Sequence, residues 1–141
     1  MKTKTIAALL LAGLAAAGCM NRQTDDTQMQ TLRQTRDWDK TFPQSDKVRH
    51  TEITFRNRFG ITLAADLYMP RDAAGPLPAV AVSGPFGAVK EQASGLYAQT
   101  LAERGFLALA FDPSFTGESG GEPRNVASPD FATEDFSAAV D

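Results

Sequence analysis

Two short, continuous apolar segments constrain the fold more than any other feature of the sequence. Residues 79–82 (AVAV) and 106–111 (FLALAF) contain no polar side chain, which is typical of strands covered on both faces in a parallel sheet. Between them, apolar residues recur at helical spacing over residues 91–104. Strand, helix and strand in this order predict a right-handed βαβ unit with two parallel strands.

The flanking segments predict a hairpin before this unit and a helix after it. Residues 51–57 and 61–68 alternate apolar and polar side chains, and Gly60 lies in the turn between them. Pro70 is expected to stop the second of these strands. A further helix is expected to start near Pro129. The predicted fold class is therefore α/β, with an antiparallel hairpin followed by a parallel βαβ unit.

The first 46 residues differ from the rest in composition. Lys2 and Lys4 precede a largely apolar run that ends at Gly18, which is the pattern of a secretory signal peptide over residues 1–18. This run is too short to span a membrane, which takes roughly 20 apolar residues. Residues 19–46 are mostly polar and predict a tether, with Trp38 and Phe42 docked on a domain over residues 47–141.

The junction at Cys19 predicts a lipid anchor. Ala16-Ala17-Gly18-Cys19 resembles a lipobox, which implies diacylation of Cys19 and cleavage before it. Acyl chains would hold the domain at a membrane surface without spanning the bilayer. Because residue 20 is Met and not Asp, the resemblance implies the periplasmic face of the outer membrane. The alternative is ordinary cleavage after residue 17, which would leave a soluble periplasmic or secreted protein with a free thiol.

Composition argues against several other classes of protein. The net charge is −3 and the Lys and Arg residues do not cluster, whereas phosphate binding in nucleic acids needs clustered cations. A single cysteine excludes an internal disulfide and a cysteine-based zinc site. We therefore expect no nucleic-acid partner, no cofactor and no metal.

Three segments carry a resemblance to a known superfamily. They are GITLAADLYMP, VSGPFGAVKEQ and FDPSFTGESGGEP. Residues 48–141 resemble the first part of bacterial α/β-hydrolases of the dienelactone-hydrolase and acyl-peptidase-like branch. The resemblance implies a strand order of 1-2-4-3-5 and a serine-type enzyme acting on ester, thioester or peptide-like acyl bonds. It places the nucleophile, the acid and the histidine downstream of Asp141, so this chain is expected to be a fragment without its triad and inactive alone.

The resemblance also suggests an oxyanion loop. Residues 83–87 (SGPFG) take the place of the superfamily's HGxxG loop, which supplies an N–H donor to the oxyanion of the tetrahedral intermediate. Pro85 has no N–H, so the backbone N–H of Phe86 is the candidate donor. The alternative is a plain strand-to-helix turn that needs glycines.

Other residues that look catalytic are given structural roles. Residues 117–121 match G-x-S-x-G. Asp112 and the four residues from Pro113 to Thr116 separate this motif from the preceding strand, and no helix is expected directly after it. Ser119 is therefore not expected to be a nucleophile on a strand-to-helix turn. His50, the one histidine, precedes the predicted hairpin and is not expected to act as a base. Asp112 is expected to brace a loop.

Two other functions stay open at this point. A non-catalytic surface lipoprotein or binding module could keep half of a hydrolase fold. A Rossmann-like nucleotide-binding module would also place Ser83-Gly84 after a strand and Asp112 after the next one. Against it, the sequence lacks G-x-G-x-x-G, and Pro85 removes one phosphate-binding N–H.

Overall fold

The computed structural model describes residues 38–141. Residues 1–37 lie outside the described residues, and they include the predicted signal peptide, Cys19 and most of the predicted tether. The elements are β1 Val48–Arg56, β2 Thr62–Pro70, β3 Ala79–Val82, α2 Ala93–Ala102, β4 Leu107–Phe111 and α3 Pro129–Val140.

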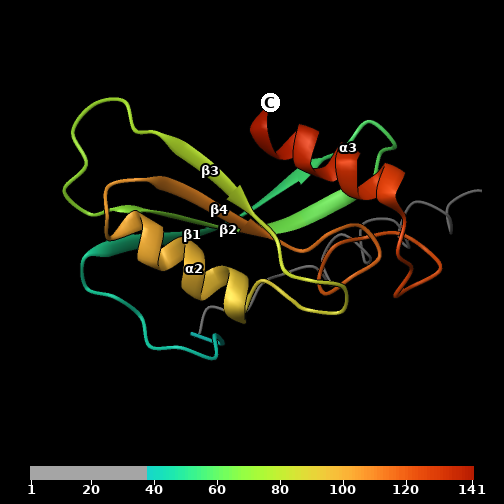
Figure 1. Ribbon diagram of the computed structural model, residues 1–141, viewed down its shortest axis with the longest axis horizontal. Coiled ribbons are helices and arrows are strands. Elements are labelled where there is room, and N and C mark those ends of the chain that lie inside the picture. Colours follow the sequence, from blue (N-terminus) through green and yellow to red (C-terminus); the bar gives the residue numbers. More distant parts are fainter. Residues whose placement is uncertain (1–37) are drawn as a thin grey trace, which may run out of the picture. The chain divides into compact units, whose positions relative to one another are not determined.

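The four strands form one mixed sheet in the order β1-β2-β4-β3 (Figure 1). β1 and β2 form the antiparallel hairpin, and β2 also pairs antiparallel with β4. β3 and β4 are parallel and are joined through α2. Both the α/β class and the expected order of these strands are confirmed.

Alternating side chains of β4 pack on the two faces of the sheet. Ala108 and Ala110 belong to the apolar cluster that includes α2, and Leu109 and Phe111 belong to the cluster that includes Ala139 of α3. Both faces of β4 are therefore covered, which explains why its sequence is apolar throughout. Ile53 and Phe55 of β1 also pack in the second cluster, so these residues share a face as predicted from their spacing.

Helix α2 is shorter than the predicted helix over residues 91–104. Its first residue is Ala93, because the preceding turn is held by other contacts. The Lys90 N–H donates to a carboxylate in the loop after β4, and the Glu91 carbonyl accepts from the Thr41 N–H at 2.9 Å. Helical periodicity continues into this turn, but tertiary hydrogen bonds decide its backbone conformation.

The segment before β1 packs on the sheet and on α2. Phe42 is 7% exposed and packs in the α2 cluster with Trp38 against it, which confirms the predicted docking. Lys40 Nζ lies 3.1 Å from Asp66 Oδ2, and His50 Nε2 lies 2.9 Å from Asp66 Oδ1. Burial raises the pKa of Asp66, but the His50 hydrogen bond and the Lys40 charge outweigh burial and hold that pKa below its ordinary value.

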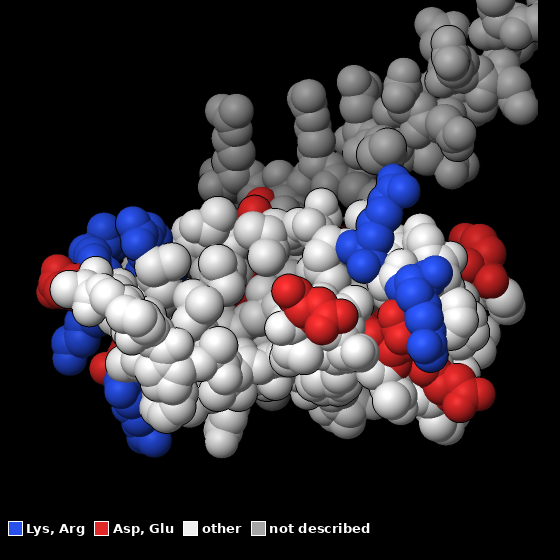
Figure 2. All heavy atoms as spheres, turned by 90° about the horizontal axis from the view of Figure 1, so that it is seen from above, with Lys and Arg blue, Asp and Glu red and all other residues white. Residues whose placement is uncertain are grey.

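The surface of the described part carries charge unevenly. On the face seen in Figure 2, Lys and Arg side chains gather toward the two ends, and the area between them is mostly neutral around a small acidic group. Within residues 38–141, none of the helices combines the length and the apolar character that crossing a membrane requires.

The docked segment predicts a stability change at Phe42. Replacing Phe42 by Ala should lower the free energy of unfolding by about 3 kcal/mol, because a buried aromatic ring leaves a cavity. Leu96→Ala is the matched control, since Leu96 is exposed on α2 and Ala is a better helix former. Urea unfolding followed by the fluorescence of Trp38, the one tryptophan, measures both variants. Equal stability of the two variants would show that residues 38–46 are not part of the folded domain.

Candidate functional site

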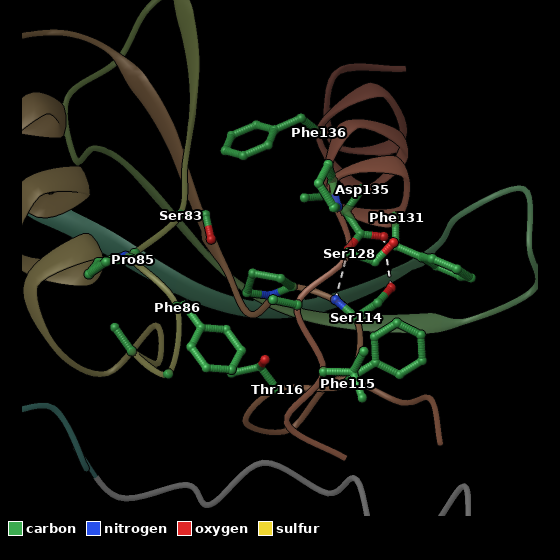
Figure 3. Close-up of a pocket in the computed structure, with 18 residues that line it drawn as sticks. Ser83, Pro85, Phe86, Ser114, Phe115, Thr116, Ser128, Phe131, Asp135 and Phe136 are labelled. Atoms are coloured by element: carbon green, nitrogen blue, oxygen red, sulfur yellow. Dashed lines mark hydrogen bonds between the residues drawn. The ribbon is translucent and has the colours of Figure 1, made fainter. Parts of the chain in front are cut away.

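A cavity of about 250 Å³ lies where β3 and β4 end. The loop after β3 forms one wall, the loop after β4 forms a second, and the start of α3 forms a third (Figure 3). The carboxyl ends of parallel strands are the usual location of active sites in open α/β sheets. The lining residues are Ser83, Gly84, Pro85, Phe86, Gly87, Ala88, Pro113, Ser114, Phe115, Thr116, Val126, Ala127, Ser128, Pro129, Phe131, Ala132, Asp135 and Phe136.

The predicted oxyanion loop forms the first wall of this cavity. The Ala88 N–H donates to the Pro85 carbonyl at 2.9 Å, which closes a tight turn around Phe86. Within the described residues, no hydrogen bond uses the Phe86 N–H, so this donor is free for a ligand. The Ser83 hydroxyl makes a long hydrogen bond of 3.4 Å to the Phe111 carbonyl. The loop is therefore a turn at the cavity with an unused backbone donor.

The carboxylate of Asp112 ties the first wall to the second. It accepts the Lys90 N–H at 2.7 Å on Oδ1 and the Glu118 N–H at 2.9 Å on Oδ2. Asp112 is fully buried, and it directly follows β4. It therefore braces both loops, the role expected from the sequence.

A buried ammonium group accompanies this carboxylate. The Lys90 side chain is 1% exposed, and its Nζ contacts Glu91, lies 2.5 Å from Glu118 Oε2, and lies 3.5 Å from Asp112 Oδ2. Burial lowers the pKa of Lys90, but hydrogen bonds to Glu118 and Glu91 and the charge of Asp112 outweigh it and raise that pKa. Burial also raises the pKa of Asp112, against the opposing charge of Lys90. Lys90 therefore stays charged at neutral pH.

The carboxylate of Asp135 joins the third wall to the second. Its Oδ2 accepts the Ser114 N–H at 2.7 Å, and its Oδ1 accepts the Ser114 hydroxyl at 2.8 Å, as the dashed lines in Figure 3 show. The same Oδ1 accepts the Asn57 amide at 2.8 Å, which adds the β1–β2 turn to the network. Asp135 thus fixes helix α3 against the rest of the site.

Phe115 in the second wall has a backbone conformation that bulky residues rarely adopt. Its φ is 71°, in the left-handed region. The Phe115 N–H donates to the Gly120 carbonyl, and the Phe115 carbonyl accepts from the Asn125 N–H, both at 2.8 Å. Such strained positions persist where the surroundings hold them, and they gather at functional sites. Here the strain orients a phenyl ring at the cavity.

Ser119 lies outside the cavity and is part of the loop's internal structure. Its hydroxyl donates to the Asp112 carbonyl at 2.6 Å and accepts the Ala64 N–H at 2.9 Å. Ser119 is 2% exposed, and no helix follows it directly. The match to G-x-S-x-G is therefore not a strand-to-helix turn.

His50 lies toward the other end of β4 from the cavity. His50 of β1 is the cross-strand partner of Tyr68 of β2. Tyr68 is in turn the partner of Ala108, near the start of β4. Its hydrogen bond goes to Asp66, and its ring contacts Trp38 at a centroid distance of 5.3 Å. His50 therefore belongs to the docking contacts of residues 38–46.

Three important residues of the site were not singled out from the sequence. Lys90, Asn57 and Asp135 act through buried hydrogen bonds between segments far apart in the chain. Asp135 carried a usable signal, because it follows Phe131 by four residues and so shares its helix face. Within residues 38–141, no cluster of three His, Cys, Asp or Glu side chains is arranged to hold a metal ion.

The Asp112 brace predicts an unusual cost for a small substitution. Gly117 has a φ of 54°, and a Cβ atom there would overlap the Asp112 carboxylate. Gly117→Ala should lower the free energy of unfolding by about 3 kcal/mol, because it displaces a buried, hydrogen-bonded carboxylate. Urea or thermal unfolding measures this change.

Gly75→Ala is the control for Gly117→Ala. Gly75 has a φ of 89°, but no atom lies within 4 Å of a Cβ built there. Its replacement should cost about 1 kcal/mol, the penalty of a left-handed residue alone. Equal losses in the two variants would show that the Asp112 carboxylate is not the constraint.

Comparisons with known proteins agree with this architecture. The protein PA2218 of Pseudomonas aeruginosa, described as uncharacterized, is 63% identical over 142 residues, which cover 94% of this chain and 38% of the relative. Its crystal structure matches with a TM-score of 0.74 at 72% identity, over 77% of this chain and 34% of that one.

Two fungal hydrolases are more distant relatives. Thiohydrolase aneE of Aspergillus aculeatus is 33% identical over 96 residues, which cover 68% of this chain and 29% of the relative. The structure of the alpha/beta hydrolase GrgF from Penicillium sp. sh18 matches with a TM-score of 0.57 at 29% identity, over 65% of this chain and 31% of that one. The chain thus spans about a third of the length of these relatives.

The family match covers the part of the chain that builds the cavity. Residues 60–141 match the family described as X-Pro dipeptidyl-peptidase (S15 family). This range includes β2, β3, β4 and both helices, together with all of the loops that line the cavity. The chain therefore belongs to the X-Pro dipeptidyl-peptidase (S15) family, within the α/β-hydrolase superfamily.

Proposed function

We propose that this chain is the first part of the catalytic domain of an exported, lipid-anchored acyl hydrolase. The substrates would contain ester, thioester or peptide-like bonds. The S15 description and the thiohydrolase name of a relative support this range of leaving groups. The longer relatives support the view that further residues complete the enzyme.

The observation that carries this proposal is the free N–H of Phe86 at the cavity. Hydrolysis of an acyl bond passes through a tetrahedral oxyanion, which needs fixed hydrogen-bond donors. In α/β-hydrolases one donor comes from the loop after the third strand, and the second is the N–H that follows the nucleophile. The loop over residues 83–87 follows β3, the third strand, and the hydrogen bond from the Lys90 N–H to Asp112 anchors the chain just after this loop.

The reaction would need a nucleophile, an acid and a histidine from outside this chain. His50 is engaged by Asp66, and both hydrogen-bonding functions of the Ser119 hydroxyl are occupied. In this proposal the nucleophile attacks the acyl carbon, and the resulting oxyanion accepts a hydrogen bond from the Phe86 N–H. The 141-residue chain would hydrolyse nothing by a triad on its own.

The oxyanion role predicts a difference between two variants at one position of the complete enzyme. Phe86→Pro removes the N–H and should lower kcat by about 10²- to 10³-fold, the loss typical of one oxyanion donor. Phe86→Ala keeps the N–H and should lower kcat only a few-fold on a short-chain ester. Steady-state turnover of p-nitrophenyl acetate measures both effects.

The comparison holds only for variants that melt at the temperature of the wild type, because proline also restricts the residue before it. The isolated 141-residue chain is the negative control and should not release nitrophenol. Wild-type turnover by a stable Phe86→Pro variant would place the donor elsewhere and contradict this reading of the loop.

The anchor is a separate part of the proposal. The AAGC sequence at the end of the apolar run supports diacylation of Cys19, which would hold the enzyme at the periplasmic face of the outer membrane. Cells fed labelled palmitate should label the wild type and not the Cys19→Ser variant. Cys19 is the one thiol of the 141 residues, so expressing this chain alone leaves no other thiol to take the label. Equal labelling of both forms would rule out the anchor.

A further inference from the structure

One aromatic ring of the cavity differs from its neighbours. Phe86 is 69% exposed and takes part in none of the ring contacts within the described residues. Phe131, in contrast, packs against Phe115 at a centroid distance of 5.0 Å and against Phe59 at 4.5 Å. Figure 3 shows the Phe86 ring at the cavity, near Thr116. The cavity therefore has a fixed aromatic wall on one side and an unpaired ring on the other.

Within residues 38–141, the lining of the cavity is almost entirely uncharged. Asp135 is the one ionisable residue that lines it, and no Lys or Arg does. The two carboxylate oxygens of Asp135 accept hydrogen bonds from the Ser114 N–H, the Ser114 hydroxyl and the Asn57 amide. Within residues 38–141, the lining therefore offers one carboxylate, largely engaged by protein donors, and no cation. An ionic group buried against an apolar lining without a partner is strongly disfavoured.

The cavity formed by residues 38–141 has a size that suits a small apolar group. A closed apolar cavity of roughly 150 Å³ binds benzene, and this open one has about 250 Å³. The available volume fits one ring with a short linker, or a branched chain of similar size. Aromatic ligands also gain from edge or offset contacts with phenyl rings.

We propose that the cavity binds an uncharged, apolar acyl group with an aromatic or branched end, and that Phe86 and Val126 form its selecting wall. Val126 is 37% exposed and lines the same cavity. This inference rests on the proposed acyl hydrolysis and specifies its substrates. The proposed acyl group differs from a dipeptide with a free N-terminus, which carries an ammonium group.

The test uses the complete enzyme and three substrates: p-nitrophenyl phenylacetate, p-nitrophenyl acetate and glycyl-proline p-nitroanilide. The wild type should have a kcat/KM for the phenylacetate at least about tenfold above that for the acetate, and the anilide should be the poorest substrate. Phe86→Ala should lower the phenylacetate-to-acetate ratio about tenfold, since a few carbon contacts account for such factors. Val126→Phe should fill the cavity and lower the ratio as well.

Tyr97→Ala is the matched control, because Tyr97 is an exposed aromatic residue of α2 outside the cavity. It should leave the ratio unchanged. Preference for the anilide would overturn this inference while leaving acyl hydrolysis in place. An unchanged ratio in both Phe86→Ala and Val126→Phe would also overturn it.

A binding experiment separates failure of the inference from failure of the proposed function. Saturation-transfer NMR with methyl phenylacetate should detect binding to the wild type and weaker binding to Phe86→Ala. Binding without hydrolysis of any ester would keep the apolar site and remove the proposed function. Hydrolysis of esters without this binding difference would keep the function and remove the site.

Discussion

The cavity depends first on the carboxylate of Asp112, which lies where β4 ends and is inaccessible to water. Its two oxygens accept the Lys90 N–H of one loop and the Glu118 N–H of the other, and the Lys90 side chain adds a direct hydrogen bond to Glu118. Burying this group is costly, and the cost is offset because Lys90 is buried beside it and both oxygens accept backbone N–H groups. This carboxylate thereby links the loop that carries Phe86 to the loop that carries Phe115.

The carboxylate of Asp135 fixes a second part of the cavity in the same way as that of Asp112. Each comes from a regular element or its end, and each accepts hydrogen bonds from the backbone of a neighbouring loop. Loops held in this way keep their geometry without packing every side chain. The apolar side chains Phe86 and Val126 can then remain exposed at the cavity. Rigid support for a partly open apolar surface is what a selective binding site requires.

The sequence predicted the elements and their order better than it predicted the contacts of the site. The apolar runs of β3 and β4 and the alternation in the hairpin depend on local periodicity, which is visible in one sequence. The superfamily resemblance indicated the loop with Phe86, and the spacing around Ser119 argued against a nucleophile there. Asp135 was missed because its role depends on which face of α3 meets Ser114. The left-handed Phe115 could not be predicted, since its backbone conformation is imposed by tertiary hydrogen bonds.

The link between Asn57 and Asp135 joins residues 78 positions apart, and this separation affects the order of folding events. Contacts between distant segments form slowly, because a long loop must close before they contribute. The β1–β2 hairpin needs only the chain up to Pro70, so it can form early as a local structure. The third wall of the cavity must wait until α3 is available and reaches the turn at Asn57. During synthesis from the N-terminus, the residues of the hairpin therefore emerge before those of α3, and the third wall of the cavity cannot close until α3 has been made.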